Sequence, residues 1–207
     1  MAADTPARGT GERFQRQRAK TRSDLLTSAR RVLAAKGYYR TKIADIAHDA
    51  GVAVGTFYLY YPTKEALFVE LVENTAHLLR GELESARAAT SEPRLRARAA
   101  LETFFRFAHA HRELFRIVFG HGATFHDIIK RNQQLFATDI AANLADGMQA
   151  RSFRPNNPEV VAQAFIGLSL QVVSWWLERE DVAVDTVIEA VLDFVFHGIE
   201  HAPGSAS

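Results

Sequence analysis

Apolar residues recur along this chain at the three- and four-residue spacing of an α-helix, and nowhere do they alternate as they would in a strand. The first clear stripe has five apolar positions on one helical face: Leu25, Leu26, Ala29, Val32 and Leu33. Similar stripes follow almost to the C-terminus, separated by breaks such as Gly120-His121-Gly122 and Pro155-Asn156-Asn157-Pro158. The pattern predicts an all-α fold of about nine helices.

Residues 41–61 have the pattern of two short helices joined by a tight turn. Thr41 can cap the first helix, because its hydroxyl can accept a hydrogen bond from an unpaired N–H of the first turn. Gly51 stands where that helix ends and the chain reverses, a position that often needs a positive φ. The second helix carries three polar side chains: Thr56, Tyr58 and Tyr60. This layout is typical of a helix-turn-helix, whose second helix enters the major groove of DNA.

The charge distribution supports binding to a polyanion near the N-terminus. Residues 1–64 hold 12 Lys and Arg against 5 Asp and Glu, whereas the remainder holds 13 against 19. The first third is therefore basic and the rest acidic, although the whole chain carries a net charge of only +1. We expect a disordered basic arm over residues 1–16, a helix-turn-helix domain over 17–64, and a ligand-binding and dimerisation domain over 65–202.

Composition excludes several other classes of protein. None of the 207 residues is cysteine, so disulfides, zinc–thiolate sites and thiol catalysis are excluded. We expect a cytoplasmic protein, since the absence of cysteine agrees with a reducing compartment. No unbroken run of about 18 apolar residues is present, which predicts no membrane partner, and the polar N-terminus lacks the apolar region of a signal peptide.

The helix-turn-helix segment and its flanks resemble the TetR family of bacterial transcriptional repressors. The resemblance rests on many evenly spaced positions: Gly37, Tyr38, Thr41, Ile43, Ile46, Ala47, Ala50, Gly51, Val52, Gly55, Thr56, Phe57, Tyr58, Tyr60, Tyr61, Thr63, Lys64, Glu65 and Leu67. It covers the first quarter to third of the chain. It implies a DNA-binding head followed by six further helices that bind a ligand and form a dimer.

The resemblance also implies which residues touch DNA. We predict contacts from Thr41, Lys42, Ala53, Val54, Gly55, Thr56, Tyr58, Tyr60 and Lys64. Thr41, Tyr58 and Lys64 are expected on phosphates, and Thr56 and Tyr60 on base edges. The usual Ser-Lys pair of the family is replaced by Ala53-Val54, which leaves methyl contacts with thymine at those two positions. Tyr61 is expected to stay largely in the core.

The second half of the chain is rich in phenylalanine and predicts an apolar ligand. We expect five aromatic residues to contact it: Phe104, Phe107, Phe119, Phe136 and Trp175. Arg106, Arg112 and Gln171 are candidates for its polar end. Several of the 14 phenylalanines must simply fill the core, and composition does not separate core from pocket. The effector is expected to be a hydrophobic small molecule such as a fatty acid, an acyl thioester or an aromatic compound.

The last two predicted helices carry broader apolar stripes than one buried face requires. By resemblance they pair with the same helices of a second subunit, so a homodimer should read a near-palindromic operator of double-stranded DNA. We predict a ligand-responsive repressor that is no enzyme and has no catalytic residue, metal or cofactor.

Two alternatives stay open at this point. A helical metal-dependent enzyme could use the histidines at 109, 111, 121 and 126, although no acid completes a ligand set. A DNA-binding protein without a ligand switch would use the same head.

Overall fold

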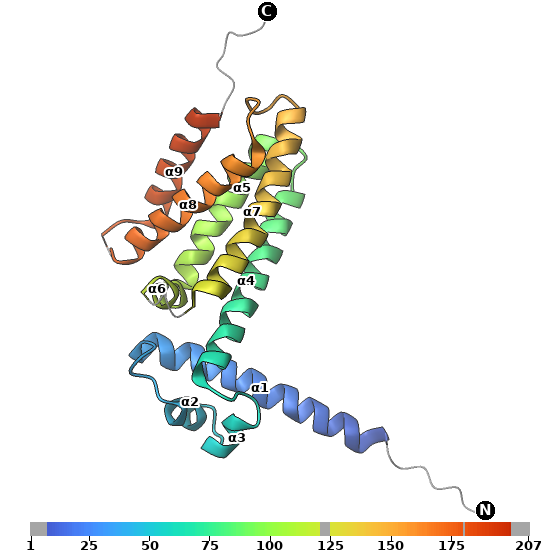
Figure 1. The fold of residues 1–207 in the computed structure, drawn as a ribbon, viewed down its shortest axis with the longest axis vertical. Coiled ribbons are helices and arrows are strands. Elements are labelled where there is room, and N and C mark those ends of the chain that lie inside the picture. The colour runs from blue at the N-terminus through green and yellow to red at the C-terminus, as the bar shows by residue number, and fades with distance from the viewer. Residues whose placement is uncertain (1–7, 121–124, 180, 200–207) are drawn as a thin grey trace, which may run out of the picture. The chain divides into compact units, whose positions relative to one another are not determined.

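The computed structural model describes residues 8–120, 125–179 and 181–199, and these form nine helices and no strand. The predicted all-α fold is therefore confirmed (Figure 1). The helices are α1 (Arg8–Lys36), α2 (Ile43–Asp49), α3 (Val54–Tyr58), α4 (Lys64–Ala88), α5 (Pro93–Ala110), α6 (Arg112–Gly120), α7 (His126–Gln149), α8 (Pro158–Leu177) and α9 (Val184–Ile199).

The chain divides into two compact units, residues 1–71 and 72–207, which we call the head and the body. The division falls inside α4, not at the predicted position after residue 64, because α4 runs unbroken from Lys64 to Ala88. The arm predicted to be disordered over 1–16 is helical from Arg8, while residues 1–7 lie outside the described part. An ion pair one turn apart, between Arg16 and Glu12 at 3.6 Å, supports this part of α1.

The head packs around a small core in which two phenylalanines are fully buried. Phe57 of α3 and Phe68 of α4 have no exposed surface, and the hydrophobic stripe of α1 covers them with Leu25, Ala29 and Leu33, each at most 1% exposed. Gly37 and Gly51 have φ of +75° and +69°, so both turns use the left-handed conformation that glycine adopts without strain. The predicted turn at Gly51 is thus confirmed.

The body is a bundle of helices with its main core between α5, α8 and α9. Phe105 and Val173 are fully buried there, and α9 adds Val187, Ile188 and Val191. Two helices begin as their sequences predict, with proline in the first turn and a capping side chain before it. Glu92 accepts from the N–H groups of Arg94 and Leu95 at α5, and Asn157 caps α8 in the same way.

Helix α8 is apolar around much of its surface. Within the described residues, it is the one helix long and apolar enough to cross a membrane, by length and composition alone. The sequence-based expectation rested on unbroken apolar runs, and here polar residues such as Gln163, Ser169 and Gln171 interrupt the apolar ones. Val160 and Trp175, at 62% and 46% exposed, lie on its uncovered side, so α8 presents apolar side chains at the surface of this chain.

Candidate nucleic-acid interface and ligand cavity

The turn between α2 and α3 brings the second short helix to the surface of the head. The N–H of Val52 donates to the carbonyl of Ala47 at 2.9 Å, which closes the turn after Gly51. Ala53 then takes an extended conformation and α3 begins at Val54. Phe57 anchors this five-residue helix in the core, so its remaining positions point outward or lie at the edge.

The exposed face of α3 holds the residues that were predicted to touch DNA. Tyr58 is 54% exposed and Val54 is 43% exposed. Ala53 and Gly55 are exposed as well, whereas Thr56 and Tyr60 are partly buried. All six residues are thus within reach of a partner at this surface, and they offer mainly methyl groups and the phenol rings of Tyr58 and Tyr60.

Thr41 does not have the position that the sequence predicted. It is only 1% exposed, and its hydroxyl donates to the carbonyl of Gly37 at 2.8 Å. The N-cap of α2 is Lys42, whose N–H donates to the Asp45 carboxylate at 2.9 Å. The prediction of Thr41 as the cap is therefore wrong, because the tight turn after Gly37 draws its hydroxyl inward. Its side chain holds the turn and is not available to a phosphate.

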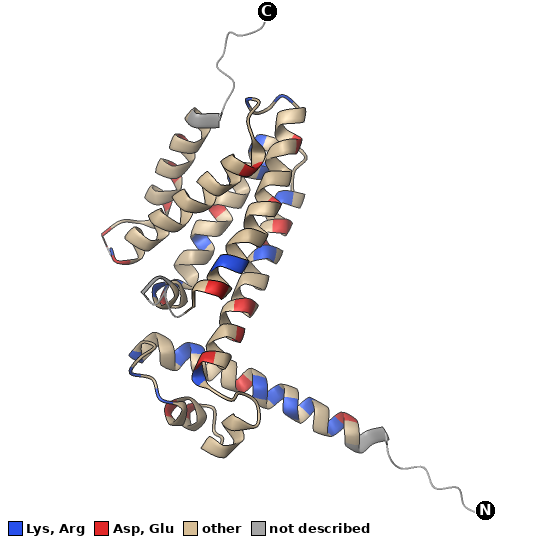
Figure 2. Cartoon of the chain, in the orientation of Figure 1, with Lys and Arg blue, Asp and Glu red and all other residues tan. Residues whose placement is uncertain are grey.

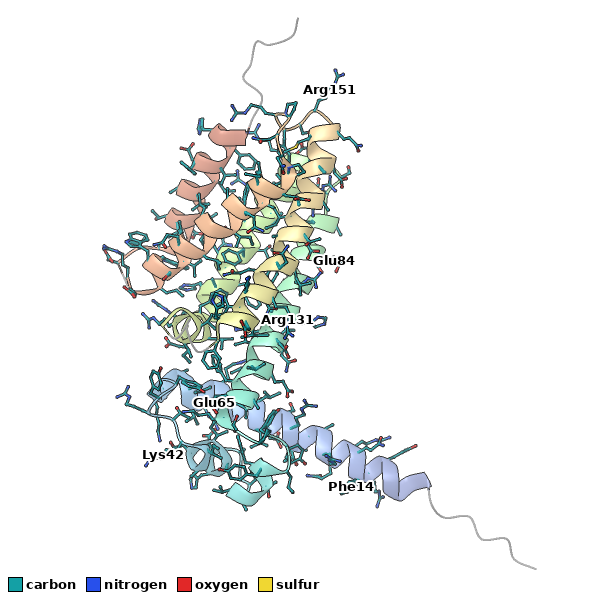
Figure 3. All side chains as sticks on the ribbon, in the orientation of Figure 1. Phe14, Lys42, Glu65, Glu84, Arg131 and Arg151 are labelled. Carbon is teal, nitrogen blue, oxygen red and sulfur yellow. The ribbon has the colours of Figure 1, made fainter. Side chains whose placement is uncertain are left out.

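Lys64 is also engaged within the head. Its Nζ donates to the carbonyls of Tyr38 and Thr41 at 2.7 and 2.9 Å and lies 4.2 Å from the centre of the Tyr38 ring. Two of its three N–H donors are thus used inside the protein, which leaves one for a phosphate. Lys42, in contrast, is exposed, and its side chain stands clear of the head (Figure 3).

Polar contacts tie α4 to the rest of the head. The hydroxyl of Tyr38 donates to Glu65 at 2.8 Å, and its burial, together with this carboxylate, raises the pKa of Tyr38. Hydrogen bonds from its own backbone N–H and from Tyr38 lower the pKa of Glu65. Arg22 of α1 reaches Glu70 at 2.6 Å. Burial raises the pKa of Tyr61 to about 12, and its ring is 3% exposed, as expected for a core residue.

Helix α1 carries a basic surface toward its N-terminal end (Figure 2). The guanidinium carbon of Arg18 lies 6.0 Å from the ring centre of Tyr60 and 5.9 Å from that of Phe14. Phe14 is 64% exposed and projects from the helix (Figure 3). This part of α1 therefore adds positive charge beside one of the residues predicted to touch DNA.

The body contains a cavity of about 210 Å³ with an almost wholly apolar wall. Helices α4, α5, α6, α7 and α8 all contribute to its lining. Phe104, Phe107 and Phe136 line it, as the sequence predicted. Phe119 belongs to α6, but its side chain lies outside the described residues. Trp175 is not in the lining: it faces outward, with the guanidinium of Arg179 4.8 Å from its ring centre.

The three polar side chains predicted to contact the polar end of the ligand also lie outside the cavity lining. Arg106 pairs with Asp185 at 2.8 Å, Arg112 donates to the carbonyl of Leu177, and Gln171 is exposed on α8. The lining instead includes Arg87 and Arg96, which sequence analysis missed. One signal could have pointed to Arg96, since a basic residue in the first turn of a helix opposes the helix dipole.

The histidines do not assemble a metal site within the described part of the chain, where no group of three possible ligands occurs. His109 stacks on Trp176 with ring centres 5.5 Å apart, and the ring centre of His111 lies 4.2 Å from that of Phe107. These two histidines therefore contribute to packing in the body. His121 lies outside the described residues.

Two family models match nearly all of the described fold. One, described as bacterial regulatory proteins of the tetR family, matches residues 25–71, and the other, described as tetracyclin repressor-like C-terminal domain, matches residues 88–199. The second match alone covers more than half of the chain. The chain belongs to the TetR family. It is therefore a DNA-binding transcriptional regulator, and the family is not one of enzymes, which answers the metal-enzyme alternative.

Individual relatives agree with this assignment. The HTH-type transcriptional activator FasR of Mycolicibacterium smegmatis is 23% identical over 201 residues, covering 96% of this chain and 91% of that protein. The fatty acid degradation regulator FadR from Bacillus halodurans has a similar structure, with a TM-score of 0.77 at 20% identity over 84% of this chain and 94% of that one. AibR, solved with isovaleryl coenzyme A and operator DNA, has a TM-score of 0.68 at 18% identity over 84% and 97%. The structural likenesses show the fold of this TetR-family protein.

Proposed function

We propose that this TetR-family protein is a homodimeric repressor that binds a near-palindromic operator and is released from it by a hydrophobic small molecule. The observation that supports a ligand switch is the apolar cavity within the body of a chain whose head binds DNA. A ligand that binds the cavity in only one of two conformations shifts the population toward that conformation. Because such coupling is reciprocal, operator DNA weakens ligand binding by the same factor.

The uncovered surface of α8 and α9 supports the dimer. On α8 it presents small and apolar residues at helical spacing, namely Val160, Ala164, Gly167 and Trp175, and on α9 it includes Phe194, which is 68% exposed. Small residues allow two helices to approach closely, and aromatic residues at the ends of such a stripe bury large areas on association. A second copy of α8 and α9 is the partner that we propose for this surface.

Gly167 offers a direct test of the dimer. A Cβ added there meets nothing within 4 Å in the protomer, so Gly167→Glu should fold and yet place a carboxylate in the dimer contact. We expect a monomer in sedimentation experiments and loss of operator binding. Gly81→Glu is the matched control, because Gly81 of α4 is equally open and lies away from α8 and α9. A dimeric Gly167→Glu protein would refute this interface.

A second experiment identifies the operator and decides whether the protein represses or activates transcription. Selection of bound fragments from random DNA should return two inverted half-sites, because a two-fold dimer presents two copies of α3. Fluorescence anisotropy with that DNA then measures whether ligands release the protein. Unchanged operator affinity across a broad panel of apolar compounds would favour a regulator without a switch. Since the relative FasR is named an activator, a reporter gene behind the selected operator decides between repression and activation.

A further inference from the structure

The cavity of the body is mostly apolar. Besides uncharged polar residues such as Asn132, Gln133 and Asn143, its lining includes a pair of arginines contributed by two consecutive helices. Arg87 lies in the last turn of α4 and Arg96 near the start of α5, and both belong to the lining. Only four residues, 89–92, separate α4 from α5, so the connection holds the two arginines at the same end of these helices. The third charged residue of the lining, Asp139, is already paired with Arg80 at 3.0 Å.

These two arginines have no acidic partner among the described residues, unlike several other arginines of the body. Five others form ion pairs: Arg80 with Asp139, Arg98 with Glu102, Arg106 with Asp185, Arg116 with Glu113 and Arg131 with Glu73. Figure 3 shows the side chain of Arg131 on α7. Within the described residues, neither Arg87 nor Arg96 forms an ion pair or a side-chain hydrogen bond, although both are partly buried.

The position of Arg96 is unfavourable for the folded protein by itself. Its Nε is buried and makes no hydrogen bond to any described residue. A buried N–H donor without an acceptor costs stability, and a charged one costs more. Arg96 also lies in the first turns of α5, where the helix dipole disfavours a cation. Both costs fall when an anion approaches, because it accepts the hydrogen bond and balances the charge.

We propose that the effector is an amphipathic anion, with an acyl chain in the apolar cavity and a carboxylate or phosphate bound by Arg87 and Arg96. This inference rests on the proposed ligand switch and names the chemical class of its ligand. The chain contacts Phe104, Phe107 and Phe136, which gain by burying apolar surface. The planar guanidinium suits a carboxylate or a phosphate, since it can donate two parallel hydrogen bonds to either.

A pair of probes with the same chain tests the charge. Titration calorimetry with dodecanoate and with dodecanol compares an anionic and an uncharged head on one apolar tail. We expect dodecanoate to bind at least about tenfold more tightly, as a charge-assisted hydrogen bond predicts. Equal affinity for the two probes, or binding of neither probe, overturns the proposal.

Substitution of the arginines locates the effect. Arg96→Gln should lower the affinity for dodecanoate about tenfold and leave that for dodecanol unchanged, so that the two probes bind alike. Arg87→Gln is the second variant and should act in the same direction. Arg98→Gln is the control, because Arg98 lies on the same helix but pairs with Glu102 and is not in the lining. A preference for dodecanoate that survives in the double variant Arg87→Gln/Arg96→Gln refutes the assignment.

The anion could belong to a free acid or to the phosphates of an acyl thioester. Dodecanoyl coenzyme A therefore forms a third arm of the titration, with the same variants. Sensitivity of its affinity to Arg96→Gln places a phosphate of the coenzyme A at this site, whereas sensitivity of dodecanoate alone assigns the free acid. Loss of sensitivity with both probes overturns the inference.

The proposed function has a separate readout. Release of operator DNA by dodecanol as effectively as by dodecanoate would leave the ligand switch intact and refute only the anionic class. Tight binding of dodecanoate that depends on Arg96, without any release of operator DNA, would support the site and refute the switch.

Discussion

The head and the body both contain phenylalanines and arginines, but the body uses some of them differently from the head. In the head, Phe57 and Phe68 are fully buried against neighbouring helices, and Arg22 and Arg31 are paired with Glu70 and Asp49 at 2.6 Å. In the body, Phe104 and Phe136 line a cavity, and Arg87 and Arg96 have no acidic partner among the described residues. A unit with a packed core and paired charges is expected to keep one conformation. A unit with a cavity and unpaired arginines is expected to change when a ligand binds in that cavity.

The largest expected difference concerns the phenylalanines. Phe57→Ala should lower the free energy of unfolding by about 3–5 kcal/mol, because the fully packed core of the head cannot close the space. Phe136→Ala should cost clearly less, since that ring already borders a cavity and makes fewer contacts. Urea unfolding followed by circular dichroism measures both. Equal losses would contradict the distinction between the packed head and the hollow body.

Two lysines of the head provide the next test, because one is engaged internally and the other is exposed. Lys64→Met leaves the carbonyls of Tyr38 and Thr41 without their donor and should cost about 1.5–3 kcal/mol of stability. Lys42→Met should leave stability nearly unchanged. If Lys42 contacts a phosphate, its loss should reduce the slope of log affinity against log salt by about one for each contact.

As a control, each lysine variant is also tested in the measurement that should change only in the other variant. Thermal unfolding of Lys42→Met and the salt dependence of operator binding by Lys64→Met should both stay close to the wild type. A large fall in the salt slope for Lys64→Met, with no loss of stability, would restore the sequence-based assignment of Lys64 to a phosphate.

Sequence reasoning succeeded where local chemistry decides the structure. Gly51 marked the turn, and the three- and four-residue spacing of apolar positions marked the helices, because both depend on residues near one another in the chain. It failed at Thr41, whose hydroxyl was drawn to Gly37, and at Trp175, which faces outward on α8. Which aromatic residue meets a cavity depends on how distant helices pack, and one helix's periodicity does not contain that information.

The charged end of the cavity was missed for a related reason. Arg106 and Arg112 were plausible because they lie beside the phenylalanines in sequence. The structure pairs Arg106 with Asp185, 79 residues away, and uses Arg112 at the end of α8. Arg87 and Arg96 stand out only when both the cavity lining and the possible acidic partners have been placed in space.

Acidic pH should act on the head through three carboxyl groups whose pKa is lowered. Hydrogen bonds from the N–H of Lys42 and then from the side chain of Lys36 lower the pKa of Asp45. A hydrogen bond from Arg31 lowers the pKa of Asp49. Hydrogen bonds from its own backbone N–H and from Tyr38 lower the pKa of Glu65. Such groups stabilise the fold above the unfolded-state pKa of about 4, and this stability is lost as the pH falls through the folded-state pKa.

Asp45→Asn makes this pH dependence measurable. The variant should melt at a lower temperature than the wild type at neutral pH, and the difference should shrink as the pH falls below about 4. Glu84→Gln is the control in the body, since the exposed side chain of Glu84 forms no ion pair or hydrogen bond with the described residues (Figure 3). A difference for Asp45→Asn that stays constant down to strongly acidic pH would contradict the linkage.

The smallest expected effect comes from the left-handed turns, which the two units again build differently. The head has glycine at both of its left-handed positions, 37 and 51, whereas the body has Arg151, with φ of 56°, after α7. The N–H of Ser152 donates to the carbonyl of Gly147 at 2.9 Å and fixes this turn. Arg151→Gly should raise the free energy of unfolding by about 0.5–1 kcal/mol, because the strain of a side chain there is removed.

The reverse change in the head should have the opposite sign. Gly51→Ala introduces into the helix-turn-helix the strain that Arg151→Gly removes from the body, and it should lower stability by about 1–2 kcal/mol. Space is not the cause, since a Cβ at Gly51 meets nothing within 4 Å. Thermal unfolding of the two variants and of the double variant measures the two effects, which should add because the sites lie in different units. Destabilisation by Arg151→Gly would show that the arginine side chain stabilises the body by more than its backbone strain costs.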